Sequence, residues 1–383
     1  MERWDFLRCL AVSWGLTLLP GRAWAGSDYD RLLILVELKG GNDGLNTVVP
    51  YADDAYYRLR PRLAVKREAV LQLDGHSGLH PSLQPLLPLW QAGELAVIQG
   101  LGYPQPNLSH FRSIEIWDTA SRSEEYLQTG WLARSFAAHP APAGFAADGI
   151  LVGAGELGPL AGGARAIALS SPEQFQRQAR LAQPAGAGRN PALAHIRKVE
   201  TDIALAAARL LPAQVDLRTE FPSGAFGNAV KTASQVIAGG AGVAVLRLTL
   251  NGFDTHQNQP GIHANLLGQL AQGLVALRSA LMALNRWNRT LILTYAEFGR
   301  RPQENRSNGT DHGTASVHFA LGGRVRGGLY GAPPALDRLD GNGNLPFALD
   351  FRSLYATALE RWWGIGSVGI LGGRFETLPV LKG

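Results

Sequence analysis

The chain has 383 residues, of which 46% are hydrophobic and 17% are charged, enough for one large core or for two domains. Its 46 glycines and 22 prolines show no period, which excludes a fibrous or low-complexity chain. The formal net charge of +5 includes no dense basic run and no basic stripe interleaved with aromatic residues, so nucleic acid is not an expected partner. A modest positive field favours anionic substrates.

Residues 1–25 have the pattern of an export signal. Arg3 and Arg8 flank the start of a short apolar stretch, and Ala23-Trp24-Ala25 is a small-x-small cleavage site. About ten apolar residues are too few to span a bilayer, and the structural alternative is an uncleaved anchor helix. Residues 3–7 resemble a twin-arginine signal in which tryptophan replaces the second arginine, so the Tat and Sec routes both stay open. We expect an exported protein, either periplasmic or extracellular.

The single cysteine, Cys9, lies inside this segment. The mature chain is therefore expected to have no disulfide and no thiol chemistry. No later run is long and apolar enough for a membrane helix, so we expect no stable membrane insertion after signal cleavage. The sequence indicates no protein partner.

Apolar runs alternate with helical patterns along the mature chain. The predicted strands are residues 31–38, 94–99, 242–250, 290–295 and, more briefly, 317–321. The predicted helices are 109–120, with Phe111, Ile114 and Trp117 on one face, a leucine stripe over 267–284, and 353–363, ended by Gly364. This alternation predicts an α/β fold with a mainly parallel sheet. Residues 26–383 are expected to form one domain, with an insertion around 120–240 that contains a flexible break at 183–191.

Acidic and histidine residues gather on Gly-rich turns, at least two of which follow a predicted strand. In open α/β sheets, ligands bind beyond the carboxyl ends of the strands. Carboxylates and imidazoles together at such a place are what a metal site needs. Asp254 and His256 are two residues apart, so in extended geometry their side chains point the same way. The candidate ligands are Asp43, Asp254, His256, Asp311, His312 and His318.

Each candidate also has a structural alternative. Asp43 suits an ordinary Asn-Asp-Gly turn, the turn at 254–256 suits a helix cap, and the turn at 311–313 suits the protein surface. His318, alone in an apolar run, suits a buried core position. The alternatives weaken together, because three such turns in one fold are not expected by chance.

Ser109 stands directly before the helix predicted at 109–120. A hydroxyl there is either a helix N-cap or a nucleophile, and the two roles are compatible because a helix N-terminus stabilises a developing anion. Arg112, one turn later, either contacts an anionic group or is a solvated helix arginine. Glu297 and Arg300 follow another predicted strand. They suit either support of the metal ligands or an internal ion pair.

The order of these motifs resembles the domain-of-unknown-function 1501 family, a branch of the alkaline phosphatase superfamily. The resemblance covers nearly the whole mature chain. The motifs are Glu37-Leu-Lys-Gly-Gly-Asn-Asp43-Gly-Leu-Asn46, Ser109-His-Phe, Gly252-Phe-Asp-Thr-His256, Glu297-Phe-Gly-Arg300, Asp311-His-Gly313 and Asp350-Phe-Arg-Ser-Leu-Tyr355.

The resemblance implies a doubly wound, alkaline phosphatase-like α/β core that holds two divalent metals beside a nucleophile. It assigns one metal to Asp43, Ser109, Asp311 and His312, and the second to Asp254, His256 and His318. Mixed nitrogen and oxygen ligands suit Zn²⁺, with Mn²⁺ or Mg²⁺ as alternatives at the more oxygen-rich site. Two metals lower the pKa of a hydroxyl such as that of Ser109 and clamp the group that is transferred, which Arg112 would also contact.

The sequence therefore predicts an exported metal-dependent hydrolase of small anionic esters of phosphate, or of sulfate, with Ser109 as the nucleophile. The alternative is a non-catalytic metal-binding or scaffold protein of the cell envelope with a hydrolase-like fold. The glycines at 153–158 match a dinucleotide fingerprint, but Pro159 follows where a helix should begin, so no organic cofactor is expected. Ser109-His-Phe-Arg112 lacks the proline and the spacing of sulfatases that modify their nucleophile.

Overall fold

The computed structural model describes residues 28–153, 155–171, 175, 201, 206–210 and 217–383. The predicted export signal with Cys9, and the predicted break at 183–191, lie outside the described residues.

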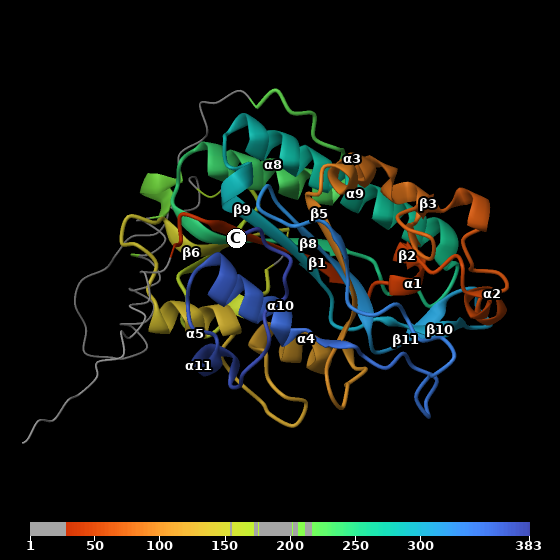
Figure 1. Ribbon diagram of the computed structural model, residues 1–383. Helices are drawn as coiled ribbons and strands as arrows, with labels where there is room; N and C mark the ends of the chain where they lie inside the picture. Colours follow the sequence, from red (N-terminus) through yellow and green to blue (C-terminus); the bar gives the residue numbers. More distant parts are fainter. Residues whose placement is uncertain (1–27, 154, 172–174, 176–200, 202–205, 211–216) are drawn as a thin grey trace, which may run out of the picture.

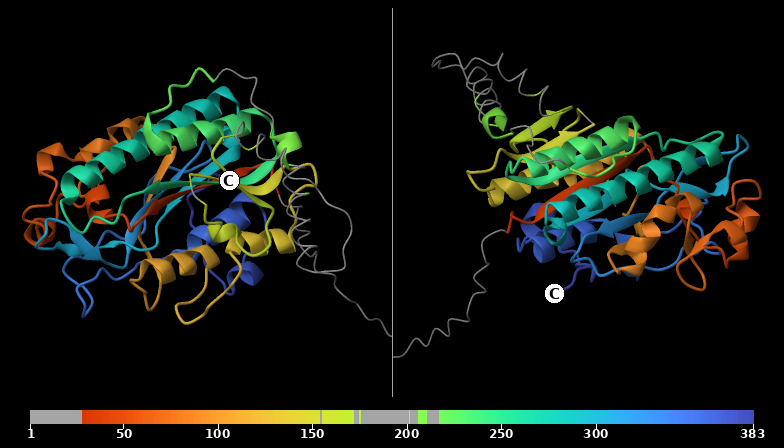
Figure 2. Two further views of the ribbon diagram at one scale, coloured as in Figure 1. Left: turned by 180° about the vertical axis from the view of Figure 1, so that it is seen from behind. Right: turned by 90° about the horizontal axis from the view of Figure 1, so that it is seen from above.

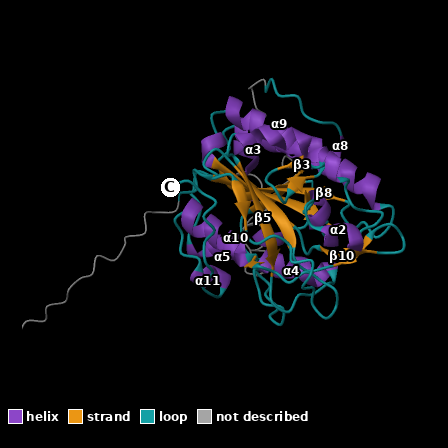
Figure 3. Ribbon diagram, turned by 45° about the vertical axis from the view of Figure 1, so that its right-hand side comes forward, coloured by secondary structure: helices purple, strands orange, loops and turns teal. Residues whose placement is uncertain are grey.

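A nine-stranded sheet forms the centre of the molecule (Figures 1 and 3). Its strands are β1 (Leu32–Lys39), β5 (Leu95–Gly102), β6 (Ala147–Val152), β7 (Ala166–Leu169), β8 (Val243–Asn251), β9 (Thr290–Tyr295), β12 (Ser316–Leu321), β13 (Gly328–Tyr330) and β14 (Leu349–Asp350). They lie in the order β13-β5-β12-β9-β1-β8-β6-β7, with β14 also paired to β5. Only β12 runs antiparallel to its neighbours, so the sheet is mainly parallel, as predicted.

The five predicted strands correspond to β1, β5, β8, β9 and β12, with ends that differ by a few residues at most. Their apolar runs are continuous because both faces of the sheet are covered. In β1, Ile34 and Val36 belong to one hydrophobic cluster, whereas Leu33 and Leu35 belong to the cluster on the opposite face. Glu37 continues the second set, which places a carboxyl group under the helices of that face.

Helices cover both faces of the sheet (Figures 1 and 2). One face carries η3 (Pro81–Leu86), α3 (Leu87–Gln91), α8 (Gly224–Ala238) and α9 (Gln259–Ala283). The other carries α4 (His110–Thr119), α5 (Trp131–Ala138), α10 (Arg352–Ala356), the π-helical turn η6 (Thr357–Trp362) and α11 (Val368–Leu371). This is the doubly wound arrangement that the sequence predicts.

The predicted leucine stripe is α9, and its leucines belong to the core. The prediction that no later run is long and apolar enough for a membrane helix is wrong for α9, the one such helix among the described residues, which has a mean hydropathy of 1.3 over 18 residues. It packs on α8 and η3, and 56% of that window is buried inside the protein, as in the core helix of a folded domain. The predicted C-terminal helix is α10 continued by η6, and Gly364 follows with a φ of 71°.

The helix predicted at 109–120 is α4, but its buried face differs from the prediction. Trp117 is buried and Ile114 is half-buried, whereas Phe111 is 89% exposed. Arg112 and Ser113 are buried instead. The first turn of α4 therefore rests on the core through polar side chains and directs Phe111 outward.

Smaller elements complete the fold. They are α1 (Gly44–Thr47), β2 (Val48–Val49), α2 (Asp54–Leu59), η2 (Arg67–Ala69), β3 (Leu71–Gln72), β4 (Gly78–Leu79), η4 (Gly158–Leu160), η5 (Trp287–Arg289), β10 (Arg300–Glu304) and β11 (Thr310–His312). Strands β10 and β11 form an antiparallel pair, and β2, β4 and β3 form a small separate sheet. The β10–β11 pair and α1 lie at the same end of the molecule (Figure 1).

Candidate functional site

Turns that follow β1, β8 and β9 meet at one end of the sheet, together with the β10–β11 pair. Gly40 and Gly41 follow β1 with φ values of 116° and 80°, a region that favours glycine. A Cβ atom on Gly40 would stand 2.4 Å from the backbone nitrogen of Asp254. Glycine at this position therefore lets the β1 turn touch the β8 turn.

The guanidinium of Arg300, fully buried, ties these turns together. It donates to the carbonyl of Gly41 at 2.8 Å, to that of Thr310 at 3.0 Å and also to that of Gly40. Its Nη2 donates to the Asp254 carboxylate at 2.6 Å. The sequence-based interpretation of Arg300 as an internal ion pair is confirmed by this contact.

Three histidines surround the Asp254 carboxylate. The Nε2 atoms of His256 and His312 lie 3.0 and 3.3 Å from its Oδ1, and the Nε2 of His110 lies 3.4 Å from its Oδ2. The two Nε2 atoms of His256 and His312 are 2.9 Å apart. Asp254 and His256 thus lie together as predicted, and they are joined by His110 and by His312, which the resemblance assigns to the other metal.

An oxygen atom faces the other ring nitrogen of each histidine. Glu297 Oε1 accepts from His110 Nδ1 at 2.8 Å, and the carbonyl of Leu108 accepts from His312 Nδ1 at 2.8 Å. Asp311 Oδ1 lies 3.5 Å from His256 Nδ1. Because a carboxylate or carbonyl oxygen only accepts, Nδ1 of His110 and of His312 must carry a proton. In the neutral ring, Nε2 then has a free lone pair that faces the Asp254 carboxylate.

The pKa values reflect these surroundings. Burial raises the pKa of Asp254, but the hydrogen bond and charge of Arg300, with His256 and His110, outweigh it and lower that pKa to about 2. The hydrogen bond to Glu297 raises the pKa of His110. Burial lowers the pKa of His312, and Arg300 adds to this effect. At neutral pH the cluster therefore has an ionised carboxylate beside a neutral His312.

This arrangement fits a metal ion. Ligand atoms of His110, Asp254 and His312 all lie within 4.8 Å of one another. Nitrogen and oxygen ligands from three residues, with room for a further ligand, are typical of catalytic Zn²⁺ sites. Partner groups that hold the second nitrogen of each ligating histidine are typical of such sites as well.

Asp311 lies at the edge of the cluster. Its side chain is 54% exposed and accepts from Asn305 Nδ2 at 3.1 Å. Asn305 also donates to the carbonyl of His256, so it holds Asp311 and His256 next to each other. The structure therefore brings four of the seven predicted ligands together, in two adjoining turns.

Asp43 lies outside this cluster. Its side chain is fully buried, forms an ion pair of 2.6 Å with the fully buried Arg60, and accepts from Gln259 and from the backbone of Asn46. Asp43 also caps α1, which is the turn role weighed for it from the sequence. Burial raises its pKa, but Arg60 and His263 together with these hydrogen bonds lower it overall.

His318 lies in the core, on the face of β12 that packs on α4. Its ring stands 5.4 Å from that of Trp117, and neither ring nitrogen has a hydrogen-bond partner among the described residues. Burial lowers its pKa to about 3. The structure therefore places His318 where the sequence alternative of a core histidine would put it, without contact to the cluster.

Ser109 and Arg112 differ in their surroundings. Ser109 is exposed at the N-cap position, and its hydroxyl makes no capping hydrogen bond. Arg112 is buried, pairs with Glu115 at 2.8 Å and donates to three backbone carbonyls of residues 122–125. The Arg112 guanidinium is thus engaged in holding a loop.

His110 is the functional residue that the sequence reasoning missed. It follows Ser109 within the motif Ser109-His-Phe, in which the sequence analysis assigns a role to the serine alone. Its spacing gives no signal, because its partners Asp254 and Glu297 come from distant strands. Glu297 contacts His110 by a hydrogen bond, which is the contact that the supporting role weighed for it would need.

A cleft of about 920 Å³ opens beside the cluster, within the size range of ligand pockets. Its walls come from the ends of β1, β8 and β9, from α4, and from the loops at 126–130 and 156–161. Asp254, His110 and Glu297 belong to both the cleft and the cluster. The cleft thus gives a ligand access to the candidate metal centre.

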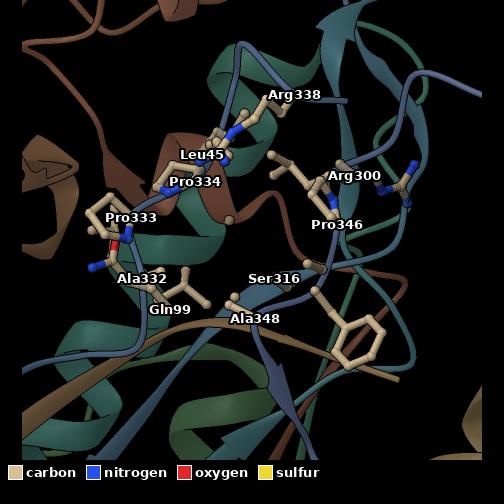
Figure 4. A pocket seen from close by; sticks show the side chains of 18 residues that line it. Leu45, Gln99, Arg300, Ser316, Ala332, Pro333, Pro334, Arg338, Pro346 and Ala348 are labelled. Atoms are coloured by element: carbon tan, nitrogen blue, oxygen red, sulfur yellow. The ribbon is translucent and has the colours of Figure 1, made fainter. Parts of the chain in front are cut away.

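A smaller cavity of about 340 Å³ lies between α1, β5, β12 and the loop at 332–348. Its walls are mostly apolar, with Gln99, Arg300 and Arg338 among the polar side chains that line it (Figure 4). No acidic residue or histidine lines it among the described residues. The cavity is therefore separate from the candidate metal centre, although the side chain of Arg300 contacts both.

Comparison with known proteins gives a family but no activity. The family model for a protein of unknown function, DUF1501, matches residues 96–370. No curated protein matches the chain.

Several solved structures share the general arrangement at low identity. The C-terminal periplasmic domain of EcEptC from Escherichia coli in complex with Zn has 11% identity and a TM-score of 0.36, over 76% of this chain and 72% of that one. Ps i-CgsB has 11% identity and a TM-score of 0.41, over 90% and 72%. The alkaline phosphatase from the Antarctic bacterium TAB5 has 10% identity and a TM-score of 0.31, over 78% and 94%.

Proposed function

The chain belongs to the DUF1501 family, and we propose that it is a metal-dependent hydrolase of phosphoric or sulfuric esters. One observation carries the proposal: three imidazoles, with oxygen atoms facing their Nδ1 atoms, turn their Nε2 atoms toward the Asp254 carboxylate. The ester class comes from the resemblance of the motifs to the alkaline phosphatase superfamily.

His110, Asp254 and His312 would hold the metal, with His256 beside them. Their nitrogen-rich set suits Zn²⁺, whereas Mn²⁺ or Mg²⁺ would need more oxygen ligands. When bound, a divalent ion supplies positive charge that stabilises an anionic ester and lowers the pKa of a nearby hydroxyl. A second ion, as the sequence predicts, would have to use the remaining neighbours, His256 and Asp311.

Ser109 remains the proposed nucleophile. It lies between Leu108, whose carbonyl accepts a hydrogen bond from His312, and His110, whose side chain faces Asp254. Its hydroxyl is exposed and makes no capping hydrogen bond. The backbone N–H groups of the first turn of α4 point toward the same place and favour an anion there.

In the proposed reaction, Ser109 Oγ loses its proton to solvent and bonds to phosphorus or sulfur, and the bond to the ester oxygen breaks. The alcohol leaves with a proton from solvent. Water then cleaves the seryl ester and restores the hydroxyl. His110 and His312 hold their positions through Glu297 and Leu108, so little reorganisation is needed during these steps.

A non-catalytic metal-binding or scaffold protein is the second candidate. The observation that favours it is the position of Arg112, whose guanidinium holds the loop at 122–125 and is not free to contact a phosphoryl group. Export to the periplasm or the extracellular space remains a prediction from residues 1–25.

Metal analysis of the purified mature protein tests the first step. We expect near-stoichiometric Zn or Mn, lost in His110→Ala and His312→Ala and retained in the control His76→Ala, which changes an exposed histidine elsewhere. A folded protein that takes up no metal would refute the metal centre.

A panel of phosphomonoesters, phosphodiesters and sulfate esters tests the second step. We expect turnover that a chelator abolishes and that Ser109→Ala abolishes without loss of metal. Full metal occupancy with no turnover of any ester, and no effect of Ser109→Ala, would establish the scaffold alternative instead.

A further inference from the structure

One face of α4 lines the cleft along its whole length. The residues of that face are His110, Phe111, Ile114, Glu115, Asp118 and Thr119. At a rise of 1.5 Å per residue, His110 and Asp118 are about 12 Å apart along the helix axis. The cleft therefore has a histidine end, next to the proposed metal centre, and an Asp118 end.

Acidic side chains of the cleft have partners, with one exception among the described residues. Glu115 pairs with Arg112 at 2.8 Å, Glu156 with Lys39 at 2.7 Å, and Glu37 with Arg247 at 2.9 Å. Asp254 pairs with Arg300 and Glu297 with His110.

Asp118 is the exception. Neither of its oxygens makes a hydrogen bond or ion pair within the part of the chain that the structure describes, and its Oδ1 is buried. Burial raises the pKa of Asp118 to about 7, although the charge of Arg247 acts in the opposite direction. A half-buried carboxyl group without a partner is costly, and a cation in the cleft would remove that cost.

Two buried side chains add unused acceptors to the same cleft. Glu37 is fully buried, and while its Oε2 accepts from Arg247 and Thr249, its Oε1 has no partner among the described residues. Glu297 is 2% exposed, and its Oε2 is likewise unpartnered in the described structure. Both residues line the cleft, so its floor presents hydrogen-bond acceptors and negative potential.

A bare metal ion does not explain these oxygens. Among the described residues, the one group of three or more side chains placed to hold a metal ion is His110, Asp254 and His312, and it includes no carboxylate of this floor. An ammonium group carries a positive charge and donates up to three hydrogen bonds, so it compensates both the charge and the unused acceptors. A hydroxyl group would donate one hydrogen bond but would leave the charge uncompensated.

The edge of the cleft suits an apolar spacer. Phe111, between the two ends, is 89% exposed, and Tyr126 on the facing loop is 69% exposed. Exposed aromatic rings can cover a carbon chain or contact a cation.

We propose that the ester bound in this cleft carries an ammonium group on its alcohol part, about 12 Å from the reacting centre, and that Asp118 binds this group. The substrate class is then an ester of a long amino alcohol or an amino sugar. This inference rests on the proposed function only for the ester, because the ammonium site is defined by the far end of the cleft.

Matched esters test the inference directly. We compare ω-aminohexyl phosphate with ω-hydroxyhexyl phosphate, or the corresponding sulfates if sulfate esters are turned over. For the intact protein we expect kcat/KM to favour the amino ester at least about tenfold, the effect of a hydrogen bond to a charged group. Asp118→Asn should abolish this preference and leave the hydroxy ester unchanged. The control Glu115→Gln, on the same helix face, should keep the preference.

Equal rates for the two esters, or a preference that survives Asp118→Asn, would overturn the inference. If no ester is hydrolysed, the proposed function fails, and calorimetric binding of hexylamine and hexanol to the protein then tests the ammonium site by itself. Binding of hexylamine that Asp118→Asn abolishes would support the site. Absence of binding, or equal binding of hexanol, would refute it.

Discussion

The buried pair of Asp43 and Arg60 allows the sharpest test of what Asp43 does. Its two side chains are fully buried, 2.6 Å apart, and far from bulk water. Asp43→Ala would leave the Arg60 charge uncompensated in the core, with only carbonyl partners such as Pro302 at 2.7 Å. Breaking a buried ion pair in this way costs about 3–5 kcal/mol of the free energy of unfolding. A metal ligand at the protein surface would cost far less in the absence of metal.

The assay is urea unfolding followed by tryptophan fluorescence, in the presence of a chelator so that bound metal adds nothing to stability. The control is Asp53→Ala, which removes another aspartate N-cap, that of α2, and should cost only about 1 kcal/mol. In the double variant Asp43→Ala/Arg60→Met, the loss should be smaller than the sum of the single losses, because both partners of the pair are gone.

The pH dependence has a definite sign. The folded-state pKa of Asp43 lies below its ordinary value of 3.8, because Arg60, His263 and the hydrogen bonds outweigh burial. The stabilisation by Asp43 is therefore fully present above about pH 4 and is lost as the pH falls through the folded pKa. Asp43→Ala that keeps its stability but loses its metal would refute the structural role and restore the sequence-based ligand role.

Three further predictions concern Glu297, His318 and Ser109. Glu297→Gln should weaken metal binding about 10–100-fold, measured by chelator competition, because His110 loses the carboxylate that holds its Nδ1; unchanged affinity would argue against His110 as a ligand. His318→Leu should keep the metal and should make the free energy of unfolding less dependent on pH. Between about pH 6.5 and pH 3, His318 is protonated in the unfolded state but neutral in the folded state, so acid destabilises the wild type. Urea unfolding across that range should show that the wild type loses about 1.4 kcal/mol per pH unit more than the variant. Ser109→Ala should lower ester hydrolysis by about a thousandfold or more at unchanged metal content, and a smaller loss would assign the nucleophile elsewhere.

The strands and the main helices could be predicted because burial on both faces leaves a direct mark on the sequence. The continuous apolar runs of β1, β8 and β9 are such marks, as is the leucine stripe of α9. The turns at 254–256 and 311–312 could be predicted as one site because acids and histidines on Gly-rich turns have few other uses. Their convergence is set by Arg300, whose contacts with three turns leave no periodic trace.

Positions that depend on one long-range contact could not be predicted. Asp43 and Asp254 both follow a strand in a Gly-rich turn, yet Arg60, seventeen residues on, draws Asp43 into the core. His110 and His318 show the opposite error, since His110, which was given no role, lies in the cluster and His318, a predicted ligand, lies in the core. Only the partners that surround an imidazole distinguish these cases.

The contacts of His312 show which protons the cluster can hold. Its Nδ1 donates to a carbonyl that can only accept, so its Nε2 carries a proton only when the ring is cationic. Burial and the Arg300 guanidinium lower the pKa of His312, so the cationic ring is disfavoured at neutral pH. A neutral His312 then turns a bare nitrogen toward the ionised Asp254 at 3.3 Å and toward His256 Nε2 at 2.9 Å. A proton on His256 could bridge two of these atoms, and His110, whose pKa the hydrogen bond to Glu297 raises, would as a cation donate from Nε2 to the second carboxylate oxygen. A divalent cation would take the place of these protons, because the same nitrogen and oxygen atoms would be its ligands.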